Sequence, residues 1–113
     1  PPINIFEGSI KTNKVLLYGV PIGSRKAPNA DVIVGVRPEG FILDPEGPLE
    51  LEVYMIETIG RDTTLLIKDI LNEGKTHRII VDASYRVAPG HKVKFSIKKD
   101  KLFVFDKKSG ELI

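Results

Sequence analysis

The stretch LELEVYMI, residues 49–56, decides the fold class of this chain. Apolar and polar residues alternate along it, with glutamates at positions 50 and 52 between apolar neighbours. Successive side chains of a β-strand point to opposite faces, so this alternation is typical of a strand with one face in a core and the other in water. Four apolar side chains are predicted to share the inward face: Leu49, Leu51, Val53 and Met55.

The same pattern extends over most of the chain. Short runs rich in valine, isoleucine, leucine and phenylalanine are separated by turn signals, and the 10 glycines and 8 prolines fall mainly between them. The β-branched run at residues 32–36 is dense enough for a strand that is buried on both faces. The predicted strands cover residues 6–10, 15–18, 32–36, 49–56, 63–67, 77–81, 91–97 and 102–105.

Helical spacing is hard to find, so we predict an all-β chain. The expected architecture is one or more OB-like small barrels, with about eight or nine short strands and little or no helix. Residues 21–31 are predicted to form a loop and residues 57–62 a turn, because both segments hold glycine and polar turn residues. The one candidate for a helical turn lies near residues 82–86.

Size and composition limit the function classes further. The 113 residues suit a single domain, residues 1–113, or two small sub-barrels with a shared core. The lack of cysteine excludes disulfides, thiolate zinc sites and cysteine nucleophiles. No apolar run approaches the roughly 20 residues of a membrane-spanning helix, so we expect neither a membrane span nor a secretory leader. The start at Pro1, without a methionine, suggests a fragment of a longer protein.

Catalytic chemistry finds little support in the sequence. The two histidines, His77 and His91, have no metal-ligand spacing with other residues, and we expect both on the surface or on a strand face. Glu50 and Glu52 share a strand face, which is typical of a solvated edge of a sheet. No phosphate-binding loop is present. We therefore predict that the chain is not an enzyme and has no metal site or cofactor of its own.

Basic residues gather near the carboxyl end, which raises the alternative of a stand-alone OB module for single-stranded nucleic acid. Such a site needs exposed aromatic rings for stacking, whereas Phe95 lies on the inward face and Phe103 and Phe105 are expected in the core. The net charge of +2 is too small to support nucleic-acid binding by itself. No nucleic-acid partner is therefore expected. The lysines concerned are Lys92, Lys94, Lys98, Lys99, Lys101, Lys107 and Lys108.

Three further segments share an order and spacing that resemble a known family. They are VGVRPE at residues 34–39, ETIGRDTT at residues 57–64 and LFVFDKKSG at residues 102–110, and the start PPINIFEG at residues 1–8 also fits. Together they resemble the carboxyl-terminal TOBE (transport-associated OB) domain in ATP-binding subunits of ABC importers, of the maltose and glycerol-phosphate sugar type.

The resemblance implies a regulatory domain that stabilises a dimer of ATP-binding subunits. It implies an ATPase domain upstream of this chain, with ATP and Mg²⁺ bound there, in a subunit that imports a solute of the sugar or polyol class. The implied partners are a second copy of the subunit, the membrane subunits of the transporter, and a regulatory protein. The implied location is cytoplasmic, at the inner face of the cell membrane.

Six motif residues are the site candidates: Gly35, Arg37, Pro38, Glu39, Glu57 and Gly60. Arg37 is expected to be extended because it precedes proline, and to meet the carboxylate of Glu39 or Glu57. Gly60 is expected to supply a positive φ in a turn. As an alternative, some TOBE-type domains bind molybdate-like anions, and the loop at residues 24–26 offers basic donors.

Overall fold

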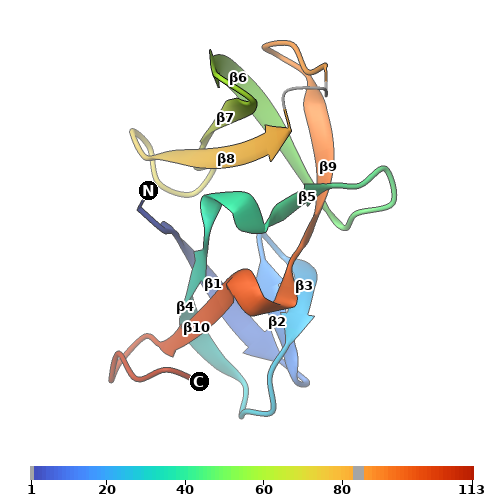
Figure 1. Ribbon diagram of the computed structural model, residues 1–113. Coiled ribbons are helices and arrows are strands. Elements are labelled where there is room, and N and C mark those ends of the chain that lie inside the picture. The colour runs from blue at the N-terminus through green and yellow to red at the C-terminus, as the bar shows by residue number, and fades with distance from the viewer. Residues whose placement is uncertain (1, 83–85) are drawn as a thin grey trace.

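Strands account for most of the structure, a computed structural model that describes residues 2–82 and 86–113 (Figure 1). Two three-residue 3-10 helices, η1 and η2, are the helices of the described residues, and neither is long or apolar enough to cross a membrane. The elements are β1 (Asn4–Lys11), β2 (Lys14–Leu17), β3 (Val20–Ser24), β4 (Ala30–Val36), η1 (Pro38–Gly40), β5 (Phe41–Leu43), β6 (Leu49–Ile59), β7 (Asp62–Lys68), β8 (Thr76–Asp82), β9 (Lys92–Ile97), η2 (Lys99–Lys101) and β10 (Leu102–Asp106).

The strands form two antiparallel sheets of five strands each. The first has the order β10-β4-β1-β2-β3 and the second the order β5-β9-β6-β7-β8. Figure 1 shows the first sheet in the lower half of the molecule and the second in the upper half, with the chain returning from β9 to β10. Both sheets are curled, so the predicted all-β, OB-like fold is confirmed.

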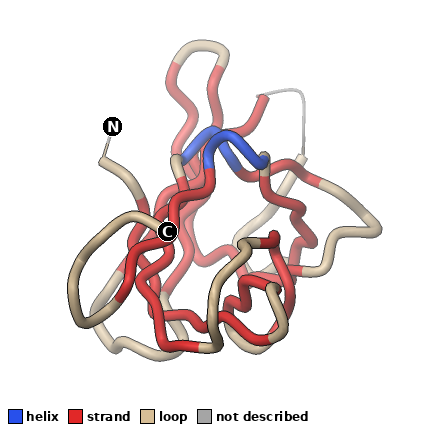
Figure 2. The backbone as a smooth tube through the Cα atoms, turned by 90° about the horizontal axis from the view of Figure 1, so that it is seen from below, coloured by secondary structure: helices blue, strands red, loops and turns tan. Residues whose placement is uncertain are grey.

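The two helical turns lie side by side where the chain passes between the sheets, as Figure 2 shows. The amide of Arg37 donates to the carbonyl of Lys101 (3.1 Å), and the amide of Lys98 donates to the carbonyl of Gly40 (2.8 Å). A Cβ atom on Gly40 would lie 2.6 Å from the Cβ atom of Lys101, so only glycine allows this approach. These contacts fix both crossings between the sheets relative to each other.

One hydrophobic cluster includes side chains from both sheets. Phe6 of β1, Phe41 of β5 and Phe95 of β9 are buried and follow one another through it. The ring centroids are 6.5 Å apart between Phe6 and Phe41 and 5.9 Å apart between Phe41 and Phe95, with edge-to-face geometry in both pairs. This row of rings connects the first sheet to the second.

The predicted inward face of residues 49–56 is correct for three of its four residues. Leu49, Leu51 and Val53 are buried, but Met55 is 48% exposed. The pairing of β6 with β7 shifts register between Val53 and Met55. Such a bulge adds one residue to a strand and moves the following side chains to the other face.

Three other expectations need correction, and a fourth is not tested. The predicted loop at residues 21–31 contains most of β3, and the predicted turn at residues 57–62 shrinks to Gly60 and Arg61 between β6 and β7. Phe103 and Phe105 are only half-buried, because Leu102 and Val104 of β10 take the core positions. The candidate helical turn near residues 82–86 falls on residues 83–85, outside the described residues.

Asn4 joins the two sheets through its side chain. Its Nδ2 atom donates to the carbonyl of Arg78 (2.7 Å), and its Oδ1 atom accepts from the amide of Arg78 (2.9 Å). Arg78 belongs to β8, an edge strand of the second sheet. The buried side-chain amide of Asn4 therefore gives the backbone of Arg78 the acceptor and the donor that a neighbouring strand would otherwise supply.

Replacing Asn4 with alanine is expected to lower the free energy of unfolding by about 2 kcal/mol, because the partly buried backbone amide and carbonyl of Arg78 lose their partners. Urea denaturation followed by circular dichroism measures this. Asn29→Ala is the matched control, since the Asn29 side chain accepts one exposed hydrogen bond from the amide of Thr12 within the first sheet. Equal losses of unfolding free energy in both variants would show that the Asn4 bridge between the sheets stabilises the fold no more than an exposed hydrogen bond does.

Candidate functional site

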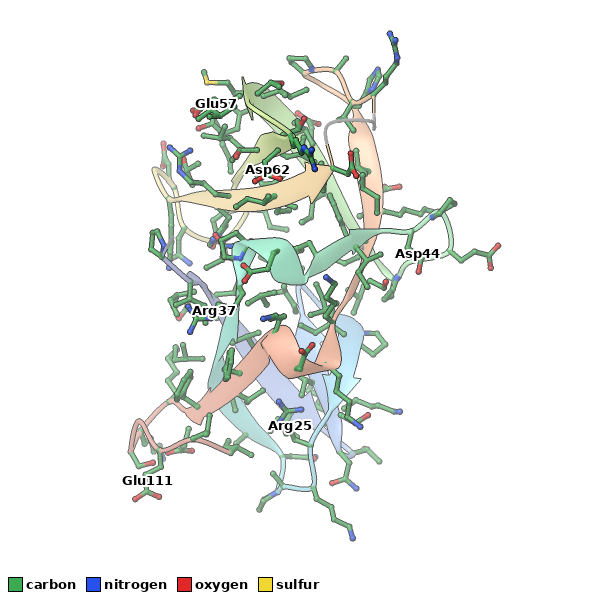
Figure 3. All side chains as sticks on the ribbon, viewed as in Figure 1. Arg25, Arg37, Asp44, Glu57, Asp62 and Glu111 are labelled. Carbon is green, nitrogen blue, oxygen red and sulfur yellow. The ribbon has the colours of Figure 1, made fainter. Side chains whose placement is uncertain are left out.

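The six motif residues lie at two separate places. Gly35, Arg37, Pro38 and Glu39 lie at the end of β4 and in η1, whereas Glu57 and Gly60 lie at the β6–β7 hairpin. Figure 3 shows Arg37 midway down the molecule and Glu57 at its top. The motif residues therefore do not converge on one site.

The backbone of the motif residues follows the prediction. Arg37 is extended, with φ −62° and ψ 146°, and Pro38 ends β4 by starting η1. Gly60 has a φ of +61° in the hairpin turn, a conformation that side chains with a Cβ atom seldom adopt.

The predicted ion pair of Arg37 with Glu39 or Glu57 is wrong. Glu57 pairs with Arg78 (3.6 Å) and Glu39 with Lys101 (3.9 Å), and all four of these side chains are substantially exposed. The guanidinium carbon of Arg37 lies 5.8 Å from the ring centroid of Phe103, a cation–π contact. Each carboxylate pairs with the cation that the strand register or the adjoining helical turn brings near.

A buried polar pair, Asp69 and His77, was missed by the sequence analysis. The Nε2 atom of His77 lies 2.8 Å from Oδ2 of Asp69, and both side chains are at most 2% exposed. The other carboxylate oxygen of Asp69 accepts hydrogen bonds from the amides of Leu71 (2.8 Å) and Asn72 (3.3 Å). The imidazole of His77 stacks on the ring of Phe6, with centroids 3.9 Å apart. The pair thus fixes the loop after β7 and packs against the first sheet.

Burial and hydrogen bonding determine the charge state of this pair. Burial disfavours the carboxylate of Asp69, but the hydrogen bonds from His77 and the Leu71 amide, with the Tyr18 hydroxyl nearby, outweigh it and hold its pKa below the ordinary 3.8. Burial lowers the pKa of His77 below the ordinary 6.5, against the attraction of Asp69. At neutral pH a neutral imidazole therefore donates its Nε2 proton to a carboxylate.

Tyr18 completes the polar cluster from the side of the first sheet. Its hydroxyl is buried and has no hydrogen bond of good geometry to a described residue, yet it lies close enough to feel the Asp69 carboxylate. Burial, followed by the interaction with Asp69, raises the pKa of Tyr18. Since solvent does not reach Asp69 or His77, this cluster is suited to positioning the loop and the sheets and not to turning over a substrate.

One signal in the sequence could have placed His77 inside. It alternates with Ile79 and Val81 along β8, and these two are buried on the same face. The expectation of a strand-face histidine is correct, but the face is the buried one. His91 is exposed, and its Nδ1 atom accepts from the amide of Ala88 (3.2 Å) in a turn.

No metal site is evident among the described residues. They hold no group of three or more histidine, aspartate or glutamate side chains that could bind a metal ion. The guanidinium of Arg25, a candidate anion donor, donates to the carbonyls of Ser24 and Leu102 at 2.9 Å each. This arginine ties β3 to β10, and Figure 3 shows it in the lower part of the molecule.

The chain is similar in sequence to known importer proteins. No family model matches the chain. It is 29% identical over 115 residues to the sn-glycerol-3-phosphate import ATP-binding protein UgpC of Ruegeria sp. (strain TM1040), a match that covers 100% of this chain and 32% of that protein. The match to UgpC of Jannaschia sp. (strain CCS1) is also 29% identical, over 97% of this chain and 31% of that protein. The predicted resemblance to importer ATP-binding subunits is confirmed.

The chain spans about a third of the length of these importer proteins. Among solved structures, the cytoplasmic molybdate-binding protein ModG, in a form with molybdate bound, has a TM-score of 0.64. The match covers 89% of this chain and 94% of ModG at 16% identity, so it shows a shared fold.

Proposed function

We propose that this chain is the regulatory, dimer-stabilising carboxyl-terminal domain of an ATP-binding subunit in an ABC importer for a sugar or polyol. The observation that carries the proposal is the match of the whole chain to about a third of two glycerol-3-phosphate import ATP-binding proteins. In the proposed subunit, an upstream ATPase domain binds ATP and Mg²⁺ and contacts the membrane subunits at the inner face of the cell membrane.

The distribution of polar groups supports a binding role over a catalytic one. The most shielded titratable pair, Asp69 and His77, is closed to substrates. Charged side chains on the surface form isolated exposed pairs, such as Lys107 with Glu7 (2.9 Å). Exposed pairs of this kind add little to stability and can exchange partners at low cost. A surface of this composition is suited to contacts with another subunit or a regulatory protein.

Deletion of residues 1–113 from the longer subunit tests the proposal. We expect the truncated subunit to bind ATP but to dimerise more weakly in sedimentation experiments, and transport to lose its regulation. The matched control is the full-length subunit in the same membrane preparation. Unchanged dimerisation together with unchanged regulation of transport would refute the proposed function.

A small-anion site is the second candidate, because ModG has this fold and binds molybdate. Calorimetry of the 113-residue chain with molybdate, tungstate and sulfate decides the matter. Heat of binding that disappears in an Arg25→Gln variant would support an anion site at residues 24–26. The absence of heat with all three anions removes this candidate.

A further inference from the structure

A groove of about 360 Å³ lies on the outward face of the first sheet. The strand register places Ser9 of β1 opposite Leu16 of β2 on one side and opposite Asp31 of β4 on the other. Glu7 shares this face with Ser9, because every second residue of a strand points to the same side. All four side chains line the groove, which we call the sheet groove. Its volume lies in the range of sites for small molecules.

Two segments that are distant in the sequence also line the sheet groove, and hydrogen bonds hold both in place. Leu71 belongs to the β7–β8 loop, and its amide donates to the Asp69 carboxylate (2.8 Å). Lys107 follows β10, and its Nζ atom donates to Oε1 of Glu7 (2.9 Å). The side-chain amide of Asn72 donates to Oε2 of Glu7 (3.4 Å). A ligand would therefore meet walls that are already ordered, which lowers the cost of binding.

Tyr18, another lining residue, has a backbone conformation that an aromatic residue seldom adopts. Its φ is +51°, and Gly19, the next residue of the turn between β2 and β3, has a φ of +80°. Glycine, asparagine and aspartate are the residues that take positive φ in such turns at low cost. Strained residues gather at ligand sites. With Leu16 and Leu71, the Tyr18 side chain gives the sheet groove an apolar part.

The charges around the sheet groove favour a neutral ligand. Glu7, and to a smaller extent Asp31, raise the pKa of Lys107, so this ammonium takes the place that a cationic ligand would need. The buried Asp69 carboxylate adds to the negative potential at Glu7, so three carboxylates lie near one ammonium and repel an anion. The cations of the next row of β1 and β2 do not line the groove; they are Lys11 and Lys14.

A neutral molecule with several hydroxyl groups matches this mixture of groups. A hydroxyl donates to a carboxylate and accepts from an ammonium or another hydroxyl, and its carbon skeleton can lie against apolar side chains. We infer that the sheet groove binds a sugar or polyol, with hydroxyl groups of the ligand donating to Asp31 and Glu7. The inference rests on the proposed function, because it makes the imported class of solute a ligand of the domain that regulates import.

Titration of the 113-residue chain with glucose and with sorbitol, followed by NMR amide shifts, tests the inference. The amides of Ser9, Leu16 and Asp31 are expected to shift. Asp31→Asn is expected to raise the dissociation constant of both probes about tenfold or more, because a neutral acceptor binds a hydroxyl more weakly than a carboxylate does. Asp100→Asn is the matched control and should bind as wild type, since Asp100 is also exposed but lies in η2, outside the sheet groove.

A pair of probes that differ by one phosphate tests the charge of the ligand. Glycerol is expected to bind more tightly than sn-glycerol 3-phosphate, because the carboxylates repel the phosphate. Tighter binding of the phosphate would overturn the assignment to a neutral ligand. The absence of shifts with glucose and sorbitol would overturn the inference, as would equal dissociation constants for wild type and Asp31→Asn. The proposed function is tested separately by the deletion in the longer subunit, so either can fail alone.

Discussion

Replacing Asp69 with alanine is expected to lower the free energy of unfolding by about 3 kcal/mol, because one buried donor and two partly buried donors lose their acceptor. The donors are the Nε2 of His77 and the amides of Leu71 and Asn72. Urea denaturation measures the loss. Asp100→Ala is the control, since Asp100 is exposed in η2, and a change within about 0.5 kcal/mol is expected for it. Similar losses in the two variants would contradict a structural role for the buried pair.

The same pair predicts that acid destabilises the chain. The pKa of His77 is lower in the folded state, so the unfolded state takes up the proton first as the pH falls below about 6.5, and stability decreases. The pKa of Asp69 is also lowered, so its contribution is lost at lower pH, as the pH falls through its folded pKa. Both effects lower the stability of the fold as the pH falls.

Denaturation curves between neutral and acidic pH check this dependence. His77→Gln is expected to remove the decrease in stability just below pH 6.5, at some cost in overall stability. His91→Gln, at an exposed turn, is the control and should leave the pH dependence as in wild type. An unchanged pH dependence in the His77 variant would contradict the assignment.

Replacing Phe6 with alanine is expected to have the other large effect, a loss of about 3–5 kcal/mol. Phe6 is 1% exposed and touches three rings, those of His77, Phe41 and Tyr18. Its removal leaves a cavity where the two sheets meet. Phe103→Ala is the matched control because Phe103 is half-buried on the outward face of β10, and a loss of about 1 kcal/mol is expected there. Comparable losses would show that the ring row does not hold the sheets together.

Much of the fold could be predicted from the sequence because local rules determine it. Alternation located the strands around residues 49–56 and 91–97, and the predicted strands at residues 6–10 and 15–18 correspond to β1 and β2. The strand β3 was missed because Pro21 and Gly23 read as loop residues. β3 is an edge strand of the first sheet, and an edge strand tolerates a proline that lacks an amide donor.

The polar cluster and the exposed Met55 could not be predicted in the same way. Asp69 and His77 meet across the connection between β7 and β8, and no spacing rule marks a carboxylate that turns back toward the next strand. The bulge in β6 leaves no mark in an alternation that continues through Met55. The motif residues were found by resemblance, but their partners depend on which strands the folded chain brings together.

The order of the strands also affects how this chain is made. The second sheet is built entirely from residues between β4 and β10, and β10 then returns to pair with β4. Pairing of such distant segments slows folding, since a long loop must close first. During synthesis, the edge of β4 stays unpaired until β10 has left the ribosome. The growing chain is most exposed to misassociation during this interval.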